Sequence, residues 1–180
     1  VGCGDLPFYY LDFLTSALDA PLVYVCGNHD GGPQYTADGS NRREIRGGVD
    51  IHGRIVVRKS LILAGLQGSM RYKAHAEYMY SESEMRMIVA QMTPRLLWNR
   101  QRFGRSLDVL VTHSPPFGIH DRPDLPPTGF KVFLSFLRLF KPRYHLHGHV
   151  HVYRQDEIVT TRHEETTVIN VYPYKVLDIE

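Results

Sequence analysis

The chain has little cysteine, no long apolar run and no excess of one charge, and each shortage excludes a class of protein. Its two cysteines, Cys3 and Cys26, are too few for a disulfide framework in 180 residues. The most apolar stretch, residues 132–140, carries Arg138 and is far shorter than a membrane span. The start also lacks the pattern of a signal peptide. We therefore expect a cytoplasmic protein with no membrane partner.

The balance of charge argues against a nucleic-acid partner. The formal net charge is +2, whereas nucleic-acid-binding domains usually show a stronger basic excess. Hydrophobic content of 43% and charged content of 22% are ordinary for a globular protein. A ligand-type carboxylate, Asp5, follows soon after Val1. We expect one domain over residues 1–180 that is incomplete at its N-terminal end.

Hydrophobic periodicity predicts short strands and amphipathic helices in mixed order. Strands are expected over residues 22–26, 49–57, 60–66, 107–112 and 144–147, with two or three more in 158–179. Helices are expected over residues 6–18, over 81–103 behind a Ser81–Glu84 capping box, and from 128 or 129 to 140. Pro94 should kink or split the long helix. The predicted fold class is α/β, with two packed mixed β-sheets flanked by helices.

Four short motifs place metal-binding types of side chain directly after predicted strands. They are Gly4-Asp5, Gly27-Asn28-His29-Asp30, Thr112-His113 and Gly148-His149-Val150-His151. Open α/β sheets bind their ligands at the carboxyl ends of the strands. Together the motifs supply a carboxylate, an amide oxygen and several imidazoles. These are the donors of a two-metal hydrolytic site.

The first two motifs suggest distinct roles for neighbouring residues. Asp5 is the candidate bridging ligand, because a carboxylate has lone pairs for two ions; the alternative is a helix N-cap. Asn28 can offer its amide oxygen to a cation. His29 should point elsewhere, as a donor to phosphate or a general acid for the leaving group. Asp30 is expected to orient the His29 ring and raise its pKa, although a simple turn would also explain this motif.

The histidines of the other two motifs complete the candidate ligand set. His149 and His151, two residues apart, should point to different sides and can serve one ion each. His113 alone would more often be structural, but its companions and the two prolines after it favour a ligand. His145 and His147 precede the last motif within a strand, so we expect them to be core residues or supports for the ligands.

These motifs resemble those of the calcineurin-like metallophosphoesterase family. The family's ordered blocks are Asp-x-His, Gly-Asp-x-x-Asp, Gly-Asn-His-(Asp/Glu), a single His and Gly-His-x-His, and four of the five are recognisable here. Residues 68–72 and 112–121 also resemble a bacterial branch. The resemblance implies an α/β/β/α sandwich holding two divalent metal ions, drawn from Mn, Fe, Zn or Co. Asp5 would bridge both ions, with Asn28, His113 and His149 at one, His151 at the other, and His29 at the phosphate.

The sequence departs from the family pattern at its start. The second Asp of the Gly-Asp block is absent, and so is the whole Asp-x-His block, which would lie on a strand before Val1. Without that block, the ion served by His151 lacks two protein ligands. Asp50-Ile51-His52 matches the missing string, but it follows the Asn-His motif and precedes a strand. We therefore expect no metal site there.

The expected function is metal-dependent hydrolysis of phosphomonoesters or phosphodiesters, with a metal-bridging hydroxide as the nucleophile. The substrate would be a small-molecule phosphate ester, which makes the protein a phosphatase or phosphodiesterase. Two alternatives stay open. The missing block favours a non-catalytic metal-binding scaffold of the same fold, and a nuclease would use the same chemistry on a polymer. The oligomeric state is open.

Overall fold

The computed structural model describes residues 1–35, 39–42, 45, 47–122, 128–154 and 156–179. The larger sheet has the strand order β12-β13-β11-β10-β7-β6 and the smaller one β1-β2-β5. The larger sheet contains β6 (Ile55–Arg58), β7 (Leu61–Leu66), β10 (Val109–Thr112), β11 (Tyr144–His147), β12 (Thr160–His163) and β13 (Thr166–Asn170). The smaller sheet contains β1 (Gly2–Cys3), β2 (Leu22–Val25) and β5 (Gly48–Asp50). Two-residue strands form the pairs β3 (Gln34–Tyr35) with β4 (Asn41–Arg42), and β8 (Ser69–Met70) with β9 (Met79–Tyr80).

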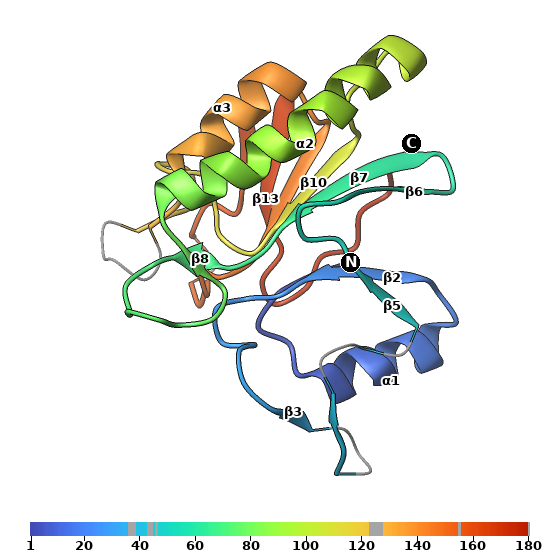
Figure 1. The fold of residues 1–180 in the computed structure, drawn as a ribbon, viewed down its shortest axis with the longest axis vertical. Coiled ribbons are helices and arrows are strands. Elements are labelled where there is room, and N and C mark those ends of the chain that lie inside the picture. Colours follow the sequence, from blue (N-terminus) through green and yellow to red (C-terminus); the bar gives the residue numbers. More distant parts are fainter. Residues whose placement is uncertain (36–38, 43–44, 46, 123–127, 155, 180) are drawn as a thin grey trace.

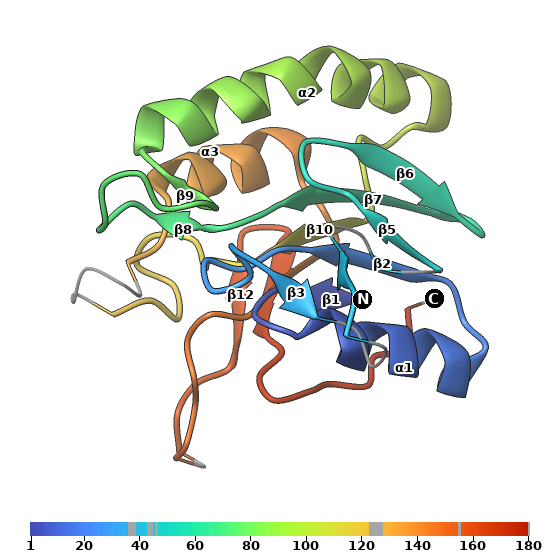
Figure 2. The same cartoon turned by 60° about the horizontal axis from the view of Figure 1, so that its bottom comes forward.

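The helices cover the outer faces of the two sheets. Helices α2 (Glu82–Phe103) and α3 (Lys131–Phe140) lie over the larger sheet, and α1 (Phe8–Leu18) lies under the smaller one (Figures 1 and 2). The smaller sheet is parallel throughout, whereas the larger one is mixed. The predicted α/β fold of two packed sheets flanked by helices is confirmed. In the described part of the chain, no helix is long and apolar enough to cross a membrane.

Three apolar clusters separate these layers. One lies between the larger sheet and helices α2 and α3, one between the two sheets, and one between the smaller sheet and α1. Strand β10 is buried on both faces: Leu110 belongs to the helix-side cluster, while Val109 and Val111 belong to the cluster between the sheets. This double burial explains why residues 109–111 of β10 are continuously apolar instead of alternating. The helix-side cluster includes Phe133 and Phe136 of α3.

The start of α3 is capped by a side chain from α2. The Glu82 carboxylate accepts hydrogen bonds from the backbone N–H groups of Lys131, at 3.1 Å, and Val132, at 2.7 Å. Phe130, at the N-cap position of α3, makes no side-chain cap bond. The negative charge of Glu82 also lies at the positive end of the helix dipole. Glu82 thus links the two helices that cover the larger sheet.

We expect Glu82→Ala to lower the free energy of unfolding by about 1–2 kcal/mol, because two N–H groups of α3 lose their acceptor. Urea unfolding followed by circular dichroism measures this change. A matched control is Glu165→Ala, which removes an exposed ion pair with Lys141 and should cost less than about 0.5 kcal/mol. Equal costs for the two variants would contradict the capping role.

The capping box at Ser81 and Glu84 is confirmed, since Ser81 Oγ accepts from Glu84 N and Glu84 Oε2 accepts from Ser81 N at 2.6 Å. Pro94 does not split the helix, because α2 is one helix of 22 residues with Pro94 inside it, whereas the kink at Pro94 stays a prediction. The predicted helix over 6–18 begins later, at Phe8, and its Leu18 is 68% exposed.

The single strand expected over residues 49–57 is also wrong. β5 belongs to the smaller sheet and β6 to the larger, so the chain passes between the sheets at Ile51, which is fully buried. Gly53 has φ +63°, and Arg54 N bonds back to Ile51 O at 3.0 Å. Two apolar runs that belong to different sheets are continuous in sequence, and the hydrophobic pattern alone does not separate them.

Candidate metal centre

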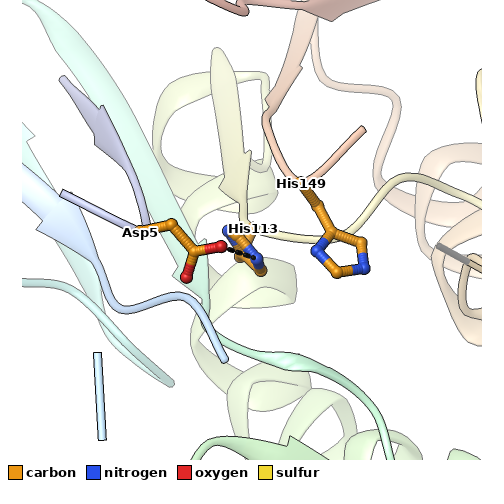
Figure 3. A group of neighbouring side chains, drawn as sticks. All are labelled: Asp5, His113 and His149. Atoms are coloured by element: carbon orange, nitrogen blue, oxygen red, sulfur yellow. Dashed lines mark ion pairs between the residues drawn. The ribbon is translucent and has the colours of Figure 1, made fainter. Parts of the chain in front are cut away.

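The four motifs come together because they follow strands of the two facing sheets. Asp5 and Asn28 follow β1 and β2, which pair in parallel in the smaller sheet. His113 and His149 follow β10 and β11, which pair in parallel in the larger sheet. Gly148 N donates to His113 O at 3.1 Å and ties the last turn to the His113 loop. Figure 3 shows Asp5, His113 and His149 converging from separate segments.

Asp5, His113 and His149 form a cluster in which one donor atom of each lies within 4.8 Å of the others. His113 Nε2 is 3.4 Å from Asp5 Oδ2 and 3.0 Å from Asn28 Oδ1. The His113 and His149 rings lie edge to face, with centroids 4.7 Å apart. Four of the five predicted metal ligands thus meet at one place.

The hydrogen bonds of His113 show that this cluster suits a cation. His113 Nδ1 lies 2.8 Å from the carbonyl oxygen of Cys3, which only accepts, so Nδ1 carries the proton. Burial lowers the pKa of His113 to about 4, which leaves the ring neutral at pH 7. Its Nε2 lone pair therefore faces the oxygens of Asp5 and Asn28, which are also acceptors. A divalent ion would satisfy these lone pairs together, and the Cys3 carbonyl would orient the imidazole as supporting groups do in metal sites.

Asn28 is oriented by Tyr72, a residue for which the sequence predicts no role. Its Nδ2 donates to the hydroxyl oxygen of Tyr72 at 3.3 Å, which turns Oδ1 toward His113. Tyr72 lies 44 residues away in sequence. The available signal was its place in the segment 68–72 that resembles the family, and that signal does not say which residue Tyr72 contacts.

The backbone around the cluster is strained and crowded. Asp5 and His149 have φ of +56° and +64°, a region that residues other than glycine seldom adopt and that is often found at functional sites. A Cβ at Gly4 would lie 2.5 Å from His113 Nδ1, and one at Gly27 would overlap the Asp5 carboxylate. Asp5 does not cap α1, whose N-cap is Pro7 with no side-chain bond. Both glycines are needed for the close approach of the loops.

Asp30 joins the first two motifs. Its buried Oδ2 accepts from Gly27 N at 2.7 Å and from Asp5 N at 2.8 Å. Burial raises the pKa of Asp30 to about 6. The predicted action of Asp30 on the His29 ring stays a prediction, whereas its bonds to the two loops position the Asp5 carboxylate.

His29 lies between two hollows beside the cluster. Its backbone N–H donates to Asp5 Oδ1 at 2.9 Å, and its side chain is exposed. One hollow has a volume of about 280 Å³ and the other about 340 Å³, and His29 lines both. The first is also lined by Asn28, Tyr72, Lys73 and Glu77, and the second by Asp5, Arg122, His149, His151 and Tyr153.

His151 shares a hollow with the cluster but is not part of it. Its ring stacks on Tyr172 with centroids 4.5 Å apart, and its Nδ1 lies 3.0 Å from the hydroxyl oxygen of Tyr153. Asp5 and His149 line the same hollow. The role of His151 as ligand of a second ion therefore stays a prediction.

The Asp50-Ile51-His52 string makes structural contacts. His52 Nδ1 accepts from Gln67 N at 3.1 Å, and its ring lies beside Tyr80. Among the described residues, the group that could hold a metal contains neither Asp50 nor His52. His145 and His147 are fully buried, as expected of core residues.

The layered fold, with carboxylate, amide and imidazole donors meeting at strand ends, defines an α/β/β/α sandwich with a candidate metal centre between the sheets. Comparison with family models shows which family of this class the chain belongs to. The model of the calcineurin-like phosphoesterases matches residues 1–153, so the chain belongs to this family.

Solved structures agree on the fold. One crystal structure, 15% identical, has a TM-score of 0.58 and matches 91% of this chain and 62% of its own. The crystal structure of TT1561 of Thermus thermophilus is 11% identical, with a TM-score of 0.54 and coverage of 91% and 68%. The chain thus spans less than two thirds of the first structure's length. No curated protein matches the chain.

Proposed function

We propose that the protein hydrolyses phosphomonoesters or phosphodiesters with a dinuclear centre of divalent metal ions. The observation that carries this proposal is the cluster of Asp5, His113 and His149, with Asn28 beside it, in a chain of the calcineurin-like phosphoesterase family. Mixed oxygen and nitrogen donors suit Mn, Fe, Zn or Co.

Each residue of the cluster has a place in this proposal. Asn28, His113 and His149 would hold one ion with Asp5, and Asp5 would share its carboxylate with a second ion near His151. Such a pair of ions supplies a nucleophile from water at neutral pH and positive charge for the phosphoryl oxygens. Asp30 and the Cys3 carbonyl hold Asp5 and His113 in position through the bonds described above.

His29 is the proposed general acid for the leaving group. Its backbone N–H bonds to Asp5, and the exposed residue lines both hollows, so its ring could reach an ester oxygen of a substrate held at the cluster. The hollows have room for the groups on either side of a phosphoryl centre. Lys73 lines one and Arg122 the other, so each offers a cation to an anionic substrate.

The proposal is tested by counting and removing metal. Protein purified with manganese should contain about two ions per chain by elemental analysis and should hydrolyse bis(p-nitrophenyl) phosphate or p-nitrophenyl phosphate. Chelation should abolish that activity and manganese should restore it. One ion per chain without activity would favour the metal-binding scaffold, and no bound ion would contradict the proposal. Activity on DNA, with salt-dependent binding, would favour the nuclease.

The acid role of His29 has its own test. We expect His29→Ala to lower kcat by about 100-fold or more for an alkyl phosphodiester, whose leaving oxygen needs a proton. The loss should be much smaller for bis(p-nitrophenyl) phosphate, because p-nitrophenolate leaves without protonation. Steady-state kinetics on both substrates measures the difference. An equal loss on both would assign His29 to phosphate binding instead.

A further inference from the structure

A chain of hydrogen bonds leads to the turn at residues 148–151, which carries the proposed metal ligand His149. Thr161 Oγ1 is 2.8 Å from His120 Nε2, and His120 Nδ1 is 3.0 Å from His147 Nε2. His147 Nδ1 is in turn 3.1 Å from the carbonyl oxygen of Gly148. The chain joins β12, the loop after β10 and the end of β11, and it ends one residue before His149.

The carbonyl at the end determines the direction of every bond. Gly148 O can only accept, so His147 Nδ1 carries a proton and His147 Nε2 is an acceptor in the neutral ring. His120 Nδ1 must then donate to His147 Nε2, which leaves His120 Nε2 to accept from the Thr161 hydroxyl. One arrangement of protons therefore satisfies all three contacts.

This arrangement of protons orients the backbone of His149, which has a positive φ. Gly148 O and His149 N belong to one planar peptide unit, so a bond that orients the carbonyl also orients the N–Cα bond about which φ of His149 is defined. That φ is +64°, an unfavourable value for a residue other than glycine. Val150 N also donates to Gly148 O, at 2.7 Å. The two bonds hold the peptide from two sides.

We propose that His120 and His147 are positioning residues of the metal centre. Their hydrogen bonds keep the Gly148–His149 peptide in the orientation that brings the His149 ring to Asp5 and His113. The inference rests on the proposed metal site but not on its catalytic activity, since the quantity that it predicts is metal affinity.

The substitutions His147→Asn and His147→Gln distinguish a role of His147 in hydrogen bonding from a role in packing. The Asn amide nitrogen overlays imidazole Nδ1 and can still donate to Gly148 O, whereas the Gln amide overlays Nε2 and cannot. Glutamine fills the histidine volume better, so a purely structural role would favour His147→Gln. We expect the opposite for the manganese affinity measured by titration calorimetry. The affinity of His147→Asn should be within about threefold of that of the natural protein, whereas His147→Gln should bind manganese about 10–100-fold more weakly.

The matched control is His145→Asn. His145 is on the same strand and equally buried, but its Nε2 contacts Thr112 Oγ1 at 2.8 Å and not the turn. This variant should lower the melting temperature without changing the manganese affinity. His120→Asn, which keeps a donor toward His147, should bind manganese better than His120→Leu.

The proton positions have a direct readout in the metal-free protein. Nitrogen-15 NMR of the histidine rings should show protonated Nδ1 and unprotonated Nε2 in both His120 and His147. Protonated Nε2 in His147 would overturn the proposal, and so would an affinity of His147→Gln equal to or higher than that of His147→Asn. Failure of catalysis with these metal affinities intact would contradict the proposed function and leave the positioning role standing.

Discussion

Replacing His149 or Asn28 by alanine is expected to abolish phosphoesterase activity while most of the fold remains. Each change removes one donor from the cluster around His113. Loss of a supporting group behind a metal ligand already costs about 10–100-fold in affinity or activity, so loss of a ligand should cost more than about 100-fold. Neither side chain belongs to an apolar cluster between the layers. Elemental analysis and hydrolysis of bis(p-nitrophenyl) phosphate measure the two effects.

His75→Ala is the control for these variants, because His75 is exposed and outside the cluster. It should keep both metal content and rate. Near-natural activity of either His149→Ala or Asn28→Ala would show that the cluster is not the catalytic site. Loss of activity with unchanged metal content would show that the affected residue contacts the substrate and is not a metal ligand.

The second large effect is expected for Gly4→Ala, which adds a single methyl group. Gly4 has φ +87°, and a Cβ there would lie 2.5 Å from both His113 Nδ1 and Gly27 N. Gly4→Ala must therefore push the His113 ring or the Gly27 loop out of place. Metal content should fall to background and activity with it.

Gly104→Ala is the matched control, because Gly104 also has a left-handed φ, +72°, but nothing lies within 4 Å of its added Cβ. It should cost only the backbone strain, about 1–2 kcal/mol of stability, with metal content unchanged. Thermal unfolding and elemental analysis of both variants make the comparison. A Gly4→Ala protein that binds metal like Gly104→Ala would contradict the crowding argument.

Local patterns were enough to predict most elements and the residues that meet at the site. The capping box before α2 and the apolar runs of β2, β10 and β11 are local signals with direct physical causes. Motifs directly after parallel strands converge because those strand ends meet at the same edge. Asp5, Asn28, His113 and His149 could therefore be selected without knowledge of distances.

The contacts that orient these four residues could not be predicted in the same way. Tyr72 reaches Asn28 across 44 residues, and the Cys3 carbonyl reaches His113 across 110. His120 lies in a loop, and its contact with His147 depends on how that loop folds back. Such contacts are specified by the packing of whole layers, which leaves no periodic or spacing signal in the chain.

The proposed ligands come from the strand ends of both sheets, and this placement would link metal binding to stability. Asp5 and Asn28 follow strands of the smaller sheet, and His113 and His149 follow strands of the larger one. A bound ion would act as a cross-link between layers that already meet through an apolar cluster and through the hydrogen bond from His113 to the Cys3 carbonyl. An ion that binds the folded state alone stabilises it by about 2.7 kcal/mol at 100 times its dissociation constant. The melting temperature of this sandwich would then depend on how much divalent metal surrounds it.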